Sequence, residues 1–123
     1  NTFKRVHQLI STIEAEIDVK TKFSKIITGM FPMGSMTGAP KIESMNIIDE
    51  YESTKRGLYS GSIGYIKPNK DFDFNVVIRS IIYDKLLKEI NVSVGSAITF
   101  KSDPESEFEE CLLKAEPMIK SLK

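Results

Sequence analysis

The sequence contains one cysteine, one histidine and no excess of charge of either sign. A disulfide needs two cysteines, so Cys111 cannot form one within the chain, and a reducing cytoplasm fits best. His7 has no second histidine and no adjacent nucleophile, which argues against a catalytic triad or a histidine metal cluster. Seventeen Lys and Arg balance seventeen Asp and Glu. No net field therefore favours nucleic acid or an anionic membrane, and we expect neither as a partner.

Long apolar runs are also missing. No stretch approaches the roughly 20 apolar residues that span a bilayer. The first five residues include neither an initiating methionine nor the start of a signal peptide. We therefore expect the chain to begin within a longer protein. The composition, 41% hydrophobic and 28% charged residues, is that of a globular domain and excludes a fibrous or disordered segment.

The first half of the chain is expected to be mainly helical. Residues 6–13 fit both a strand and a helix, and we favour a strand. A short helix should follow and end near Phe31, because Pro32 prevents regular continuation. The turn-forming segment 34–40 precedes a second helix that begins at Pro40. Its apolar side is expected to pack on a sheet and consists of Ile42, Met45, Ile48 and Tyr51.

The second half begins with short β-rich runs. Residues 59–66, 72–83 and 87–99 are separated by polar turns and predict an antiparallel meander. With neither repeats nor a linker, the chain should be one α+β unit, an antiparallel β-sheet with helices packed on one face. A last helix should be capped by Asp103, and Pro117 should kink it or end it early. Its predicted buried stripe is Phe108, Cys111, Leu112, Ala115 and Ile119.

Two acids and one base share a face of this last helix. Glu107, Glu110 and Lys114 have i, i+3 and i+7 spacing, which places them within roughly 60° of one another. The two carboxylates could coordinate Mg²⁺, which typically takes one or two protein carboxylates beside water and an anionic substrate. By itself, the spacing fits an exposed acidic face with Glu–Lys pairs more readily. A metal site therefore needs further support.

Three other features could bind an anion. Arg79 interrupts an apolar strand, on the same face as Asp73 and Asn75, and could grip a carboxylate or form a structural salt bridge. The segment 34–40 could hold an anion at a helix start, or it could be a plain helix-entry turn. Around Gly95, backbone amides could meet a ligand, although a glycine bulge explains the residue equally well.

Five blocks in a fixed order resemble the chorismate-binding enzymes, a family that includes anthranilate, aminodeoxychorismate, isochorismate and salicylate synthases. They are FPMGSMTGAPKIESMNIIDE from Phe31, GSIGYI from Gly61, VVIRS from Val76, VGSAI from Val94 and SDPESEFEECLLKA from Ser102. The similarity extends from about Val6 to the end. The TGAPK form with GSIGYI looks most like component I of aminodeoxychorismate synthase, since anthranilate synthases more often show SGAPK and a GAVGY-like block.

The resemblance implies that residues 1–123 are the C-terminal part of a larger chorismate-binding fold. Such an enzyme replaces the 4-hydroxyl of chorismate by ammonia in a Mg²⁺-dependent reaction that feeds folate synthesis, and a glutamine amidotransferase subunit supplies the ammonia. Glu107 and Glu110 would help to hold Mg²⁺, with Lys114 beside them. The other residues implied to bind substrate are Thr37, Gly38, Tyr65, Arg79, Gly95 and Ser96.

The chain departs from the family pattern in places. Gln8 occupies the position of a family histidine, with His7 one residue earlier, and Ala97 replaces a common glycine. The family's other Mg²⁺ carboxylates, its general acid and the lysine of its PIKGT block lie upstream, so we expect negligible turnover from these 123 residues alone. Two alternatives stay open: component I of anthranilate synthase, and a non-catalytic assembly module that presents sheet edges to its missing half.

Overall fold

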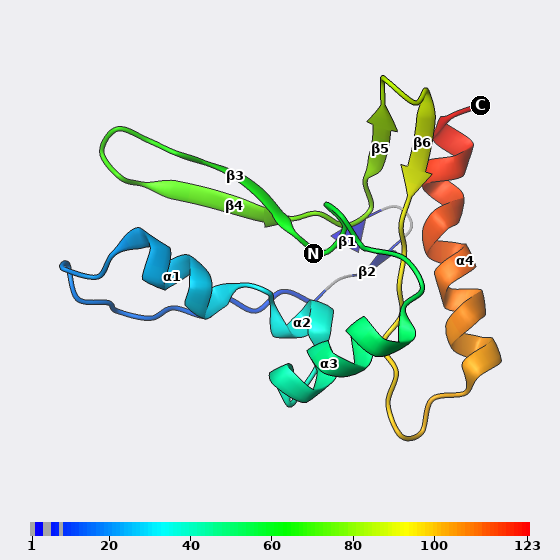
Figure 1. Cartoon of the computed structure of the whole chain (residues 1–123), viewed down its shortest axis with the longest axis horizontal. Coiled ribbons are helices and arrows are strands. Elements are labelled where there is room, and N and C mark those ends of the chain that lie inside the picture. The colour runs from blue at the N-terminus through cyan, green and yellow to red at the C-terminus, as the bar shows by residue number, and fades with distance from the viewer. Residues whose placement is uncertain (1, 4–5, 8) are drawn as a thin grey trace. The chain divides into compact units, whose positions relative to one another are not determined.

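The computed structural model describes residues 2–3, 6–7 and 9–123 and divides the chain into two compact units, Asn1–Met30 and Phe31–Lys123 (Figure 1). The first unit contains the antiparallel strands β1 (Thr2–Phe3) and β2 (Val6–His7) and the helix α1 (Phe23–Met30). The end of α1 confirms the helix predicted before Pro32. The strand favoured for residues 6–13 is confirmed only at its start, because residues 9–22 form neither helix nor strand.

Two helices open the second unit. The predicted turn 34–40 is partly helical, because α2 spans Gly34–Thr37 and ends at Gly38, whose φ of 128° favours glycine. Helix α3 (Lys41–Tyr51) follows Pro40 as predicted. Its expected packing on a sheet is wrong: α3 lies mainly against α2, which the short connection places beside it, and Ile42 and Tyr51 are exposed.

The four strands of the second unit form two antiparallel hairpins. In the first hairpin, β3 (Ser62–Ile66) pairs with β4 (Phe72–Val76), and in the second, β5 (Ile81–Asp84) pairs with β6 (Glu89–Val92). The predicted α+β class and the antiparallel pairing are confirmed. The predicted single meander is wrong, because the run 72–83 is interrupted between β4 and β5 and the two hairpins form separate sheets.

Arg79 lies in this break. Its φ is 52°, in the left-handed region, so the strand alternation stops before it. The prediction that Arg79 sits inside a strand, on the same face as Asp73 and Asn75, is therefore wrong. Arg79 instead lies two residues after Val77. Val77, Ala115 and Met118 are the three buried hydrophobic residues among those that the structure describes.

Helix α4 (Pro104–Ser121) runs beside β6 (Figure 1). Asp103 caps it as predicted, since its side chain accepts a hydrogen bond from the backbone N–H of Ser106 at 3.0 Å. Pro117 does not end the helix early, because it removes one backbone donor close to the C-terminal end and the last turn still forms. The predicted buried stripe is only partly correct, because α4 buries Ala115 and Met118 and leaves Phe108, Leu112 and Ile119 exposed.

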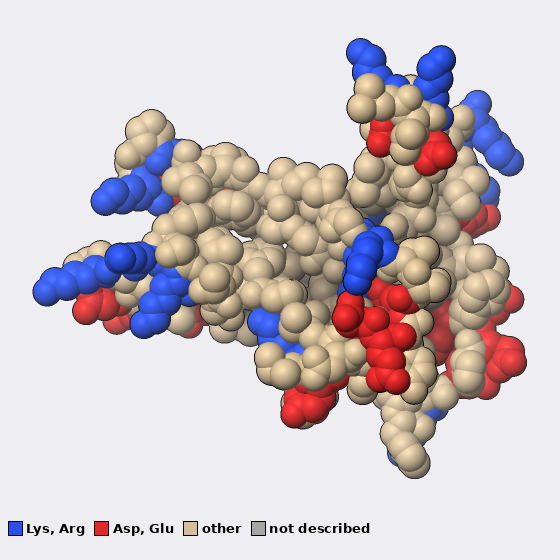
Figure 2. Space-filling model, viewed as in Figure 1, with Lys and Arg blue, Asp and Glu red and all other residues tan. Residues whose placement is uncertain are grey.

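The β3–β4 hairpin exposes much of its apolar surface. Ile63, Tyr65 and Ile66 are each more than half exposed. In Figure 2, uncharged side chains cover most of this hairpin, and charged ones gather towards its turn. Among the described residues, no helix has both the length and the apolar content needed to cross a bilayer.

Candidate functional site

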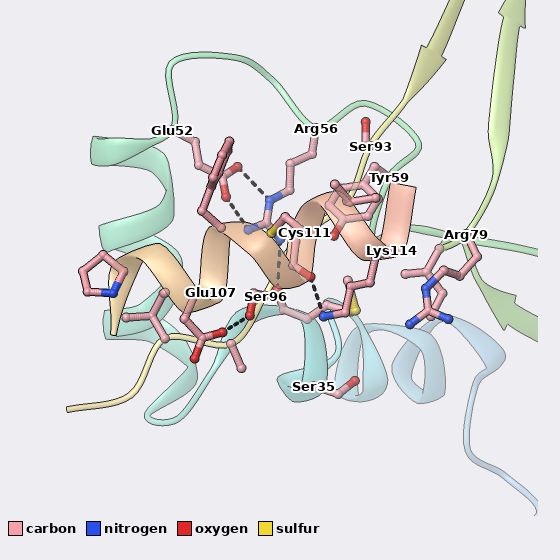
Figure 3. Close-up of a pocket in the computed structure, with 18 residues that line it drawn as sticks. Ser35, Glu52, Arg56, Tyr59, Arg79, Ser93, Ser96, Glu107, Cys111 and Lys114 are labelled. Atoms are coloured by element: carbon pink, nitrogen blue, oxygen red, sulfur yellow. Dashed lines mark hydrogen bonds and ion pairs between the residues drawn. The ribbon is translucent and has the colours of Figure 1, made fainter. Parts of the chain in front are cut away.

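A cavity of about 530 Å³ in the second unit brings together most of the predicted site residues (Figure 3). Its volume is in the usual range for small-molecule sites. Helix α4, the loop after β6, the segment before β3 and the break between β4 and β5 all contribute side chains. The predicted residues that line it are Arg79, Gly95, Ser96, Glu107 and Lys114.

Helix α4 directs an acid and a base into this cavity. Glu107 accepts a hydrogen bond from the Ser96 hydroxyl. This bond, and a second one from the Ser102 hydroxyl, lower the pKa of Glu107 below its usual value of 4.5, so the carboxylate is ionised at neutral pH. Glu107 and Lys114 of the predicted stripe thus line a cavity. Glu110 is 52% exposed and forms with Lys114 the Glu–Lys pair that the spacing also allowed.

Lys114 links α4 to the loop after β6. Its Nζ lies 2.5 Å from Glu110 Oε1 and donates a hydrogen bond to the carbonyl oxygen of Gly95 at 2.9 Å. Glu110 itself lines a second cavity, which it shares with Arg79 and Lys114. Of the two predicted metal ligands, Glu107 thus lines the first cavity and Glu110 the second, and Lys114 lines both.

Gly95 lies against Tyr59. A Cβ atom at residue 95 would come within 2.7 Å of the Tyr59 hydroxyl oxygen, so a larger residue would displace the Tyr59 side chain. No hydrogen bond within the described part of the chain uses the backbone amides of Gly95 and Ser96. These amides can therefore donate to a bound anion.

Arg79 is the cation of the cavity for which the described residues supply no partner. Among the hydrogen bonds and ion pairs of the described residues, none involves its guanidinium. The structural salt bridge allowed by the sequence is thus not formed there, which favours a guanidinium that receives a carboxylate from a ligand. Its left-handed φ is a strained conformation for a residue with a side chain, and such strain is typical of functional positions.

Three predicted residues lie elsewhere. Thr37 lines a neighbouring cavity, and its hydroxyl donates to the carbonyl oxygen of Met33 at 3.1 Å. Gly38 ends α2 beside Ser44. Tyr65 is an exposed residue of β3 whose ring centre lies 5.9 Å from the Lys67 ammonium. The substrate contacts implied for these three residues remain predictions.

The cavity wall contains an ion pair that was not predicted from the sequence. Arg56 Nε and Nη2 donate to the two carboxylate oxygens of Glu52 at 2.8 and 2.5 Å. Both residues line the cavity, and so does Tyr59, whose pKa is raised by burial. The i, i+4 spacing of Glu52 and Arg56 was the available signal, but Arg56 lies beyond the predicted helix, where that spacing has no fixed meaning.

The two α4 carboxylates fit a hard divalent cation only with additional ligands. Among the described residues, no group of three or more His, Cys, Asp or Glu side chains is placed to hold a metal. Glu107 and Glu110 keep acceptor capacity beyond their present contacts, because an ionised carboxylate has about four lone-pair sites. Two such carboxylates, completed by water and an anionic ligand, match the requirement of Mg²⁺.

These features, an arginine and a lysine beside two acids in one α+β unit, define a site for a small anionic ligand. The sequence matches the chorismate binding enzyme family over residues 1–120, and the chain belongs to this family. The predicted resemblance is thereby confirmed.

Individual relatives refine this assignment. Over 97% of its length, the chain is 44% identical to a probable chloroplastic aminodeoxychorismate synthase of Oryza sativa subsp. japonica. It is 41% identical over 98% to an aminodeoxychorismate synthase of Streptomyces griseus, and 38% identical over 98% to an anthranilate synthase component 1 of Acetivibrio thermocellus. The matches cover 13%, 16% and 24% of these relatives, so the chain spans a quarter of their length or less.

Proposed function

We propose that the protein containing this chain converts chorismate and ammonia to 4-amino-4-deoxychorismate. The observation that carries the proposal is that Arg79, which has no partner among the described residues, lines one cavity together with Glu107 and Lys114 of α4. The similarity to aminodeoxychorismate synthases supports the choice of reaction within the family. In this reaction an amino group from ammonia replaces the 4-hydroxyl of chorismate, which leaves as water. The enolpyruvyl group is retained.

Different residues of the cavity bind different parts of the dicarboxylate substrate. Arg79 grips one carboxylate with two parallel N–H donors, and the free amides of Gly95 and Ser96 donate to the same group. Lys114, fixed by Glu110 and the Gly95 carbonyl, adds positive charge beside the ring. Thr37, Gly38 and Tyr65 are proposed as further contacts on the strength of the family motifs.

Glu107 and Glu110 would hold Mg²⁺ together with water and the ring carboxylate of the substrate. When bound, the ion supplies positive charge that stabilises the substrate carboxylate and the departure of the hydroxyl. The contributions of the chain are orientation and charge: the Ser96 hydroxyl fixes the rotamer of Glu107, and the Lys114 ammonium fixes that of Glu110.

Other parts of the enzyme complete this proposal. Ammonia would come from a separate glutamine amidotransferase subunit, and the upstream part of the same enzyme would supply the remaining Mg²⁺ ligands and the general acid. The product would be used in folate synthesis. The cytoplasm stays the predicted location, although the names of two plant relatives describe them as chloroplastic.

The metal role can be tested by calorimetric titration of the full-length enzyme with Mg²⁺ and chorismate. We expect Glu110→Ala to weaken Mg²⁺ binding at least about tenfold, because it removes one of the two α4 carboxylates from the proposed shell. Glu109→Ala is the matched control, since Glu109 is an exposed acid of α4 that is not among the lining residues of either cavity. Equal Mg²⁺ affinities for the two variants would contradict the proposal.

Anthranilate synthesis is the second candidate, because several relatives at 32–38% identity are named anthranilate synthase component 1. Anthranilate has no enolpyruvyl group, so its formation must release this group from chorismate as pyruvate. We expect the full-length enzyme, supplied with chorismate, Mg²⁺ and ammonium, to consume chorismate without releasing pyruvate. Stoichiometric pyruvate would identify the anthranilate reaction instead.

A further inference from the structure

An acid lies in the wall of the cavity proposed to receive a dianion. Glu52 follows the last residue of α3 and lines the same cavity as Arg79, Glu107 and Lys114. Its pKa is lowered by its hydrogen bonds to Arg56, so it is ionised at neutral pH. An unpaired carboxylate in this wall would repel an anionic substrate.

Arg56 covers this charge in a geometry that differs from a surface ion pair. Two of its nitrogens bond the two Glu52 oxygens, and Nη1 donates to the carbonyl oxygen of Met36 at 2.9 Å and to the Ser60 hydroxyl at 3.2 Å. Its side chain is only 25% exposed. The guanidinium is thus fixed to α2, to the end of α3 and to the segment before β3. Figure 3 shows its pairing with Glu52 in the cavity wall.

These bonds leave Arg56 little capacity to bind a ligand itself. A guanidinium has five N–H donors, and four hydrogen bonds to protein groups already use most of them. Arg79, in contrast, has no protein partner among the described residues. The two arginines of the cavity therefore have different roles.

We propose that Arg56 is a positioning residue that neutralises and immobilises Glu52, so that the cavity admits a dianionic substrate and Arg79 remains the cation that binds it. This inference rests on the proposed function, because it takes chorismate as the dianion. A purely structural tie would need the same hydrogen bonds but would not depend on the charge of Glu52.

The experiment compares three variants of the full-length enzyme, Arg56→Gln, Glu52→Gln and the double variant, assayed with chorismate, Mg²⁺ and ammonium. We expect Arg56→Gln to raise KM on the order of tenfold, as for like charges about 10 Å apart at an effective dielectric constant of about 20, with a much smaller change in kcat. Glu52→Gln should lower KM, because it frees a positive charge. The double variant should have a KM near that of the wild type.

Lys55→Gln is the matched control. It removes the same charge one residue away, but Lys55 pairs with Asp49 at 3.1 Å in solvent and is not a lining residue of this cavity. Its KM should equal that of the wild type. The KM increase of Arg56→Gln should also shrink as salt is added, because salt screens charge repulsion.

If the wild type uses chorismate normally, two kinetic outcomes would overturn the role of Arg56 and leave the proposed function intact. The first is a KM increase in Glu52→Gln, and the second is a double variant as impaired as Arg56→Gln. Thermal unfolding of each variant shows whether it folds. If Arg56→Gln does not, the direction of the Glu52→Gln effect still decides, since that variant keeps the bonds of Arg56 to Met36 and Ser60. A wild-type enzyme that does not use chorismate would overturn both proposals.

Discussion

Asp103 fixes the start of α4 through an ionised side chain. Its carboxylate accepts hydrogen bonds from the backbone N–H of Ser106 at 3.0 Å and from the Ser106 hydroxyl at 2.7 Å. These bonds lower the pKa of Asp103 below its usual value of 3.8. Because the folded state has the lower pKa, the stabilising effect of the cap is fully present above the unfolded value and is lost as the pH falls through the folded one.

A peptide of residues 100–123 tests this effect by circular dichroism. We expect Asp103→Ala to lower its helix content at neutral pH, because the first turn loses its side-chain cap. Asp103→Asn keeps an uncharged cap, so this variant should retain most of the helix. Because Asn does not titrate, the variant should also lose less helix than the unmodified peptide when the pH falls below 3.8. Equal helix content in Asp103→Ala and the unmodified peptide would rule out the cap.

Arg79 and Gly95 show how single residues shape the site in opposite ways. Arg79 has a side chain at a φ of 52° that suits glycine, whereas Gly95 has no side chain at a place where a Cβ atom would meet Tyr59. Arg79 holds its guanidinium at the cavity without a partner among the described residues, and Gly95 lets two segments approach. Both features depend on the backbone, so neither is visible in the type of residue alone.

At the scale of elements, the β3–β4 hairpin depends on a glycine. A Cβ atom at Gly64 would lie 2.2 Å from the carbonyl oxygen of Asp73 and 2.5 Å from ring atoms of Phe74. The oxygen belongs to the paired strand, so it cannot move away without disturbing the ladder. Gly64 therefore allows the register in which it pairs with Phe74.

We expect Gly64→Ala to destabilise this hairpin by about 1–3 kcal/mol, the usual range for an overpacked position. Hydrogen exchange of the full-length enzyme should show lower protection of the amides in β3 and β4, with little change in β5 and β6. Ile63→Val, a change of one methylene at a side chain that is 56% exposed, is the control and should exchange like the wild type. Unchanged protection in Gly64→Ala would show that the hairpin accommodates the added Cβ atom and would contradict this prediction.

At the scale of the whole molecule, the described residues leave many apolar side chains uncovered. Val77, Ala115 and Met118 are buried, whereas Ile63, Tyr65 and Ile66 of β3 are mostly exposed and the strands of both hairpins have unpaired edges. Contiguous apolar surface and open strand edges are the features through which chains associate.

We therefore expect the 123-residue chain, prepared alone, to associate with increasing concentration and to show negligible turnover with chorismate, Mg²⁺ and ammonium. The full-length enzyme should be active in the same assay. Size-exclusion chromatography with light scattering measures the first property, and chorismate consumption measures the second. A compact, monomeric 123-residue chain that converts chorismate would contradict both expectations.

The sequence by itself determined the end of α1, the starts of α3 and α4, the shared face of Glu107 and Lys114, and the family. These features follow from local signals: Pro32 and Pro40 on either side of α2, Asp103 before α4, and a helical repeat that fixes which side chains lie together. Such signals act within a few residues of each other, so they survive in any tertiary context that keeps the helix.

Only the tertiary structure decided that the β-rich runs form two separate hairpins, that Arg79 lies outside a strand, and that Arg56 bonds Glu52 in the cavity wall. The hydrogen bond from Arg56 to the carbonyl oxygen of Met36 joins residues 20 positions apart. The periodicity of apolar residues cannot predict such a contact. It indicates which side chains share a face of one helix or strand, and not which elements pack together.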